Sequence, residues 1–117
     1  KVYEVLWQDT EIGINSDIPW STTFDVFNAM NKVISEMSVA GNNVGRLGHG
    51  LGLQLTEPPS HRDEDKTVIK ENMVLTIEPG LEYAPGKMIV HEENIIINKD
   101  GAELITKRAP KEIPVIK

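Results

Sequence analysis

The sequence predicts an α+β fold in which two helices precede a curved antiparallel sheet. In roughly the first third of the chain, apolar residues recur at the three- and four-residue steps that are typical of helices. In the second half, short apolar runs are separated by turn residues, which is typical of strands. The 117 residues, of which 39% are apolar and 26% charged, are enough for one small globular domain with its own core.

An amphipathic segment at residues 2–12 predicts the first helix. Its partial apolar stripe consists of Val2, Val5, Leu6 and Ile12. Gly13 is the expected end of this helix, because glycine favours helix C-termini. Residues 14–21, which include a proline, are then expected to form a loop.

The second helix is predicted from about Phe24 to Val39. Its buried face is marked by apolar residues at helical steps, namely Phe24, Phe27, Met30, Val33, Ile34 and Met37. Thr22 or Thr23 is the expected N-cap, since a hydroxyl can accept a bond from a free N–H of the first turn. The segment Gly41-Asn42-Asn43 is expected to end the helix, because these residues tolerate a left-handed backbone.

The second half of the chain opens with two predicted strands and a loop. Residues 51–55 are expected to be extended and to end at Pro58-Pro59. Residues 60–72 carry a run of charges and are expected to form a solvated loop. Met73–Glu78 is nearly continuously apolar, which indicates a strand buried on both faces.

A hairpin and a closing strand complete the predicted sheet. A turn at residues 84–87 joins residues 81–83 to a second arm at residues 88–98. After a further turn, residues 103–106 are expected to form the last strand. The proline-containing tail is expected to run as an irregular strap.

Composition narrows the classes of partner. The net charge is −6 and the sequence has no basic stripe, so we expect neither nucleic acid nor membrane as a partner. The chain has no cysteine, which excludes disulfides and thiolate ligands and fits a reducing compartment, so we expect a cytoplasmic protein. No apolar run has the length of a membrane-spanning helix. Because the chain opens at Lys1 directly in a helical pattern, we expect a piece of a longer protein.

His49 and Glu78 are the first two candidate functional residues. Glycines flank His49, which lets the backbone pass close to a site, although this pattern alone is more typical of a turn. Glu78 ends the apolar strand, where a carboxylate needs a cation or several hydrogen-bond donors. The alternative is a strand-end glutamate that reaches solvent beside Pro79-Gly80.

Glu92 and Glu93 provide the third candidate. Adjacent residues of a strand point to opposite faces, so one of them can enter a site while the other meets solvent. The alternative is that both are surface charges. His91 lies on the side of Glu93, so we do not expect it to bind together with Glu92. One imidazole and two carboxylates without sulfur suit manganese, cobalt, iron or zinc in a hydrolytic two-metal site.

These motifs resemble a known family. The segments GHGLGLQLTEPPS, MVLTIEPGLEY and VHEENIII, with the ending GAELITKRAPKEIPVI, are similar to the C-terminal part of pita-bread metallopeptidases. That family includes Xaa-Pro aminopeptidases, prolidases, methionine aminopeptidases and creatinases. The resemblance implies that residues 1–117 are the C-terminal half of a pita-bread catalytic domain. It also implies hydrolysis of amide bonds in short peptides or similar small substrates.

The resemblance also implies a ligand set. The family holds two divalent metal ions with two aspartates, one histidine and two glutamates, and His49, Glu78 and Glu92 match the last three. By the same resemblance, Glu78 and His49 are catalytic, with Glu78 as general base. The aspartates of the helical region do not match the family pair: Asp9, Asp17 and Asp25. We therefore expect the chain to be truncated upstream of the aspartate ligands, to be inactive alone, and to bind little or no metal.

One position departs from the peptidase pattern. Many peptidase members carry a second histidine seven residues after the ligand histidine, where this chain has Thr56. His61 is close in sequence, but as a loop residue it is a weak substitute. Two alternatives therefore stay open: a relative that acts on a small metabolite, such as an ectoine hydrolase or a sulfoniopropionate lyase, and a catalytically dead binding domain.

The implied truncation predicts self-association. In the family, the two halves of the catalytic domain share one curved sheet. A single half exposes a strand edge and apolar surface, both of which favour association. We therefore expect homo-oligomers.

Overall fold

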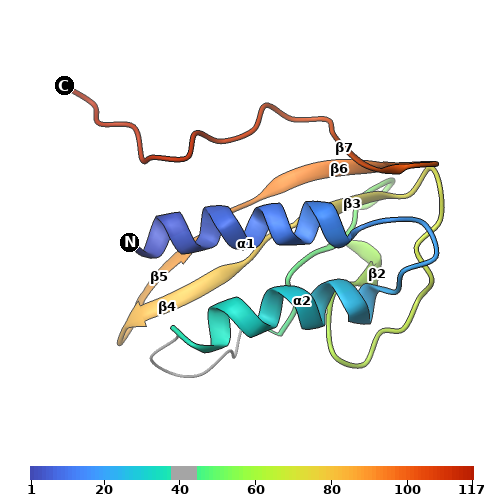
Figure 1. Ribbon diagram of the computed structural model, residues 1–117, viewed down its shortest axis with the longest axis horizontal. Helices are drawn as coiled ribbons and strands as arrows, with labels where there is room; N and C mark the ends of the chain where they lie inside the picture. Colours follow the sequence, from blue (N-terminus) through green and yellow to red (C-terminus); the bar gives the residue numbers. More distant parts are fainter. Residues whose placement is uncertain (38–44) are drawn as a thin grey trace.

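The protein is described by a computed structural model that covers residues 1–37 and 45–117. Among these residues, two helices, α1 (Val2–Ser16) and α2 (Thr23–Ser35), pack together on one side of an antiparallel sheet (Figure 1). The strands found in the described residues are β1 (His49–Gly50), β2 (Glu57–Ser60), β3 (Val74–Ile77), β4 (Gly80–Ala84), β5 (Lys87–Val90), β6 (Glu93–Asn98) and β7 (Gly101–Leu104). The predicted α+β class, with helices before an antiparallel sheet, is confirmed.

The strand order brings the three candidate segments together. The main sheet has the order β2-β1-β3-β6-β7, and β4 and β5 form a separate hairpin. All pairings are antiparallel, and the register of β3 and β6 sets Thr76 opposite Asn94 and Ile77 opposite Glu93. The start of β1, the end of β3 and the start of β6 therefore lie next to one another.

Helix α1 is longer than predicted. It continues through Gly13, the expected stop, and ends at Ser16. A Cβ on Gly13 would lie 2.7 Å from Cγ2 of Ile77 and 2.8 Å from Sδ of Met30. Gly13 is thus the point where α1 approaches both α2 and the sheet, and its role is close packing rather than termination.

Helix α2 begins as the sequence predicts. Thr22 is its N-cap, and its hydroxyl and backbone form a reciprocal capping box with Asp25. In the described residues the helix ends at Ser35, whereas the expected stop at residues 41–43 lies outside them. Within residues 1–37 and 45–117, neither helix has the length and apolar character needed to cross a bilayer.

The first predicted strand is wrong. Residues 51–55 are not a strand: residues 52–56 form bends, and the side chains of Leu53 and Leu55 are 105% and 84% exposed. Pro58 and Pro59, expected to break a strand, lie inside β2 and are joined by a cis peptide bond. Since β2 is at the sheet edge, the missing N–H groups of the two prolines are tolerated there.

The hairpin is confirmed, but its second arm is divided. β4 and β5 are joined at Pro85-Gly86, where Gly86 has a φ of 70° and donates its N–H to the Glu82 carboxylate. The arm expected over residues 88–98 leaves the hairpin after Val90 and enters the main sheet at Glu93. The closing strand β7 starts two residues earlier than predicted. The tail then runs irregularly alongside α1, as expected for a strap (Figure 1).

The core lies between the helices and the main sheet. Alternation along β3 and β6 turns Leu75, Ile77, Ile95 and Ile97 toward the helices, where they are fully buried with Leu6, Val26, Met30 and Ile34. The same alternation turns Thr76 and Asn94 to the other face of the sheet. The candidate site lies on that other face.

Candidate metal centre

A pocket of about 310 Å³ contains all three predicted site residues. Its lining residues are Arg46, His49, Leu51, Leu55, Thr56, Thr76, Glu78, Glu92 and Asn94. They come from β1 and the segments on either side of it, from the end of β3 and the residue that follows it, and from the start of β6 and the residue that precedes it. The sequence missed Arg46, Thr76 and Asn94: only strand register shows that Thr76 and Asn94 share this face, and Arg46 reaches the pocket from the segment before β1.

His49 is held in one orientation at the start of β1. Its backbone N–H donates to the hydroxyl of Thr76 at 3.0 Å, and its side chain is 5% exposed. Ring atom Nδ1 lies 2.7 Å from the carbonyl oxygen of Gly50. A carbonyl can only accept, so Nδ1 carries a proton and Nε2 is left as the nitrogen that faces the pocket. Such an arrangement orients an imidazole for binding a metal ion.

The glycines around His49 serve close strand packing. A Cβ on Gly48 would meet a backbone oxygen of β3 and the ring of His61. A Cβ on Gly50 would meet backbone oxygens of β2. The sequence suggested that these glycines allow close approach to the site, whereas their positions show that β1 is pressed between β2 and β3.

Glu78 directly follows β3 and faces His49. Its backbone N–H donates to Leu47 at 2.9 Å, and its Oε1 lies 3.2 Å from Nε2 of His49 and 3.8 Å from Nε of Arg46. Burial raises the pKa of Glu78, and the Glu92 carboxylate raises it further, while His49 and Arg46 oppose the shift. A cation placed between the two carboxylates would remove this repulsion.

Glu92 and Glu93 point to opposite faces, as predicted. Glu92 lines the pocket and its side chain remains exposed there. Glu93 lies opposite Ile77 on the helix side of the sheet and is only 2% exposed. The expectation that the second glutamate meets solvent is therefore wrong, because Glu93 is buried against the C-terminal segment.

His91 lies on the same side as Glu93, as expected, and away from the pocket. Its Nδ1 is 3.1 Å from the hydroxyl of Thr10, and its ring meets the edge of Tyr3 at a centroid distance of 5.5 Å. Burial lowers the pKa of His91, and the Arg108 cation adds to this effect. The imidazole is therefore a neutral packing group between α1 and the sheet.

The residues of the pocket fit a divalent cation in kind. One imidazole nitrogen and two carboxylates are suitable ligands, and the carboxylate of Glu78 is partly desolvated. Within the described residues, no group of three ligand side chains converges tightly enough to enclose an ion. Among those residues the helical-region aspartates lie elsewhere: Asp9 is buried in α1, Asp17 pairs with His61, and Asp25 completes the capping box of α2.

Thr56 and His61 differ in their relation to the pocket. Thr56 lines it, whereas His61 is fully buried beneath β1. Nε2 of His61 lies 3.0 and 3.2 Å from the two carboxylate oxygens of Asp17, which is also fully buried. The prediction that His61 lies in a solvated loop is therefore wrong. No local signal could have corrected it, because Asp17 is 44 residues away in sequence.

Comparison with known proteins identifies the family. The sequence model of Metallopeptidase family M24 matches residues 1–99. The chain belongs to metallopeptidase family M24. This family membership agrees with the resemblance seen in the motifs around His49, Glu78 and Glu92.

The M24 relatives are proteins of about three times this length. The Xaa-Pro dipeptidase of Pyrococcus furiosus is 32% identical over 108 residues, which are 92% of this chain and 31% of that protein. The prolidase structure from Pyrococcus furiosus superposes with a TM-score of 0.85 at 29% identity, over 93% of this chain and 32% of that one. The structure of the X-Pro aminopeptidase of Thermotoga maritima superposes with a TM-score of 0.84 at 28% identity, over 98% of this chain and 32% of that one. The fold is consistent with the C-terminal half of the pita-bread fold.

M24 membership also bears on the cofactor. A metallopeptidase family implies divalent metal ions in the complete protein. The M24 chain described here contributes an imidazole and two carboxylates to the pocket where such ions would bind. Its own residues therefore form part of a candidate metal centre.

Proposed function

We propose that the chain is the C-terminal part of the catalytic domain of a dinuclear metal-dependent hydrolase that cleaves short Xaa-Pro peptides. The observation that carries this proposal is the pocket itself. His49, Glu78 and Glu92 come from three separate segments and line the same face of the sheet. The relatives named as Xaa-Pro dipeptidases support the choice of substrate.

In this proposal His49, Glu78 and Glu92 bind two divalent ions, and two aspartates upstream of this chain complete the ligand set. Manganese, cobalt, iron and zinc all suit these ligands. The bound metals supply polarisation of the scissile carbonyl and activation of water. Glu78 accepts the proton of the attacking water, a role that its burial and raised pKa favour. Through its bond to Gly50, His49 keeps Nε2 directed into the site.

Metal content of the full-length protein tests this proposal. After incubation with manganese and desalting, we expect two ions per chain and hydrolysis of an Xaa-Pro dipeptide that a chelator abolishes. The 117-residue chain, treated identically, is expected to retain little metal and to be inactive. A folded full-length protein that retains no metal would contradict the proposal and favour a binding domain of the same fold.

A second candidate substrate class is a small metabolite. Thr56 lines the pocket seven residues after His49, where many peptidases carry a histidine. A threonine hydroxyl can donate a hydrogen bond but cannot become a cation, so a transition-state charge is stabilised less at this position. Assay of the full-length protein against Xaa-Pro dipeptides, ectoine and sulfoniopropionates separates the two candidates, and efficient dipeptide turnover alone would exclude the second.

We also propose a cytoplasmic location and self-association. The absence of cysteine and the charge of −6 support the location and make nucleic acid and anionic membranes poor partners. Exposed apolar side chains support self-association, notably Trp20, Leu53 and Leu55.

A further inference from the structure

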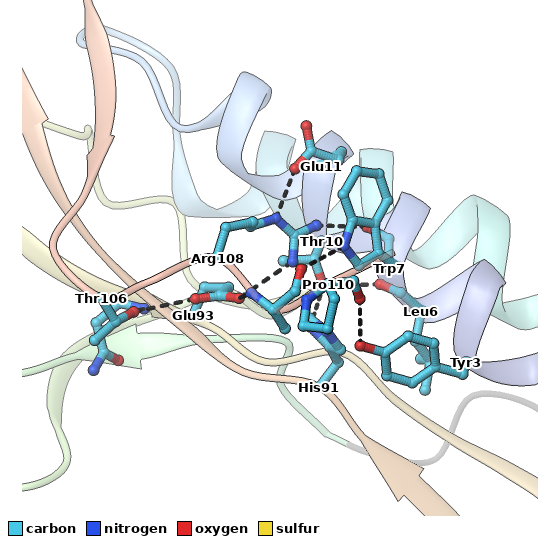
Figure 2. Close-up of polar contacts among 12 residues, drawn as sticks. Tyr3, Leu6, Trp7, Thr10, Glu11, His91, Glu93, Thr106, Arg108 and Pro110 are labelled. Carbon is cyan, nitrogen blue, oxygen red and sulfur yellow. Dashed lines mark hydrogen bonds and ion pairs between the residues drawn. The ribbon is translucent and has the colours of Figure 1, made fainter. Parts of the chain in front are cut away.

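Within the C-terminal tail, residues 106–110 form the part that contacts α1 most closely. We call only this segment the strap. Arg108 is the centre of this contact (Figure 2). Its Nε lies 2.8 Å from Oε1 of Glu11, its Nη2 donates to the carbonyl oxygen of Trp7 at 2.9 Å, and its guanidinium lies 4.3 Å from the centre of the Trp7 ring. A guanidinium that bonds in several directions and stacks on an indole is held in one orientation.

Two aromatic side chains of α1 hold the strap at its other end. Nε1 of Trp7 donates to the carbonyl oxygen of Ala109 at 2.9 Å. The hydroxyl of Tyr3 donates to the carbonyl oxygen of Pro110 at 2.6 Å. The strap therefore follows α1 through side chains whose own positions are determined by the helix (Figure 2).

Glu93 is the residue of the sheet to which the strap binds. Its Oε1 accepts from Nη1 of Arg108 at 3.2 Å and from the backbone N–H of Ala109 at 2.8 Å. Its Oε2 accepts from the hydroxyl of Thr106 at 3.1 Å. A carboxylate that is 2% exposed costs free energy to bury, and these charge-assisted bonds offset that cost. Glu93 can keep its buried position only while the strap is in place.

The position of Glu93 determines which way Glu92 points. Glu93 is the first residue of β6 and pairs with Ile77 in antiparallel register. Glu92, which precedes Glu93, and Glu78, which follows Ile77, therefore lie next to each other just beyond this pair. Neighbouring residues of a strand face opposite sides of the sheet. Anchoring Glu93 on the helix side therefore turns Glu92 toward the pocket, beside Glu78. A rotation or slip at Glu93 would move Glu92 away from it.

We propose that Arg108 and Glu93 act as positioning residues that hold Glu92 at the metal pocket, so that metal affinity depends on the C-terminal strap. This inference rests on the proposed function, because it assumes that Glu92 binds metal. Neither Arg108 nor Glu93 lines the pocket, so each acts only through its neighbour. Removal of groups that orient metal ligands typically weakens metal binding by about 10–100-fold.

The test is titration of the full-length apoprotein with cobalt, followed by its visible absorption, in single-residue variants. We expect Arg108→Met and Glu93→Gln each to raise the cobalt Kd by about 10-fold or more and to alter the cobalt spectrum. Arg108→Lys keeps the charge without the planar fork, so we expect a smaller loss of affinity. If Arg108→Met fails to fold, Arg108→Lys and Glu93→Gln carry the test.

Two control variants separate positioning from general stability. Arg62→Met breaks an exposed ion pair with Glu64 and lies away from the strap. Tyr3→Phe removes the bond to Pro110 but leaves the contacts of Glu93 intact. Both are expected to keep the cobalt Kd within about 2-fold, even if Tyr3→Phe lowers the Tm as far as Arg108→Lys does.

Different results would contradict the positioning role and the proposed function. If the unmodified protein binds cobalt and a folded Arg108→Met variant binds it with the same Kd and spectrum, the positioning role is wrong and the proposed function stands. A Kd that follows Tm equally in all variants, Tyr3→Phe included, would likewise overturn the positioning role. If the unmodified protein binds no cobalt, the proposed function is wrong and this inference is overturned with it.

Discussion

Glu78 is the residue on which the proposed chemistry depends. It lies at the end of β3, 3.2 Å from the Nε2 of His49, and both burial and Glu92 raise its pKa. A carboxylate in this environment accepts a proton more readily than one in water. The same features make it a ligand that a divalent cation would stabilise.

We expect Glu78→Gln to reduce kcat/KM of the full-length protein for an Xaa-Pro dipeptide by at least about 10²–10⁴-fold, because it removes a proton acceptor without changing the side-chain shape. Steady-state kinetics with saturating manganese measures the effect. Glu71→Gln, at an exposed position outside the candidate site, is the matched control and should behave like the unmodified protein. Activity retained in Glu78→Gln would contradict the role of general base.

Asp9 is a second residue with an unusual environment. It is fully buried in α1, and neither carboxylate oxygen has a hydrogen-bond partner among the described residues. Burial raises its pKa to about 8 from an ordinary value of 3.8. The folded chain therefore keeps a proton on Asp9 that the unfolded chain loses, so the free energy of unfolding falls as the pH rises between these two values.

Asp9→Asn removes this ionisation. We therefore expect the variant to gain stability relative to the unmodified chain as the pH rises from 3.8 to about 8. The Tm difference should be largest near pH 8 and should shrink toward about pH 3, which is below 3.8 and where Asp9 is protonated in both states. Thermal unfolding followed by circular dichroism across this range measures it. Asp100→Asn, at an exposed turn, should show no such trend. A Tm difference independent of pH would contradict the assignment.

At the scale of elements, the approach of α1 to its neighbours depends on one missing side chain. Gly13 lies inside the helix, where alanine would ordinarily be favoured by about 1 kcal/mol. A Cβ there would lie within 2.8 Å of both Ile77 and Met30, and overpacking of this kind costs about 1–3 kcal/mol. Packing should therefore outweigh helix propensity.

We accordingly expect Gly13→Ala to destabilise the protein, although it places a better helix former in a helix. Chemical denaturation measures the change in the free energy of unfolding. Asn28→Ala is the control, because Asn28 lies on the exposed face of α2 and only propensity acts there. Stabilisation by Gly13→Ala would show that α1 can move away from the sheet at no cost.

The Asp17–His61 pair joins the end of α1 to the segment beneath β1. Both side chains are fully buried, and the backbone of His61 bonds to Leu47 and Gly48 on either side. We expect Asp17→Ala to cost about 3–5 kcal/mol, because it leaves a buried polar ring without its partner. Equilibrium denaturation measures this cost, with the exposed Asp63→Ala as control. A loss below about 1 kcal/mol would show that the pair contributes little to stability.

At the scale of the whole molecule, the chain spans about one third of the length of its M24 relatives. Its candidate site opens on the sheet face away from the helices, and the bends beside it expose Leu53 and Leu55. A surface of this kind is typical of an interface between parts of a larger assembly.

We expect the isolated 117-residue chain to form dimers or larger species through this apolar surface. Light scattering coupled to gel filtration gives the molar mass. The double variant Leu53→Ser and Leu55→Ser should shift the distribution toward monomer, because it removes exposed apolar area without touching the core. A monomeric unmodified chain at micromolar concentration would contradict the expectation.

The features that the sequence predicts correctly are those that depend on residues close together in the chain. Helical periodicity located α1 and α2, and the capping residue Thr22 marked a helix start. The apolar run before Glu78 located β3, and Pro85-Gly86 located the hairpin turn. Motif spacing then selected His49, Glu78 and Glu92, which the structure brings to one pocket.

The errors share a different cause. Gly13 was expected to end a helix, the two prolines to break a strand, and His61 and Glu93 to meet solvent. In each case the deciding contact comes from a segment far away in sequence or from sheet position: Ile77 and Met30 for Gly13, the sheet edge for the prolines, Asp17 for His61, and Arg108 for Glu93. Propensity and periodicity carry no information on such partners.

The sequence by itself determined the fold class, the two helices, the order of the strands from β3 onward, the family and three candidate ligands, because periodicity and motifs are local properties of the chain. Only the tertiary structure decided which polar groups are buried and paired, which glycines allow close packing, and that the strap binds Glu93, the neighbour of Glu92. These features depend on strand register and on contacts between distant segments, and both arise only when the helices, the sheet and the strap pack together.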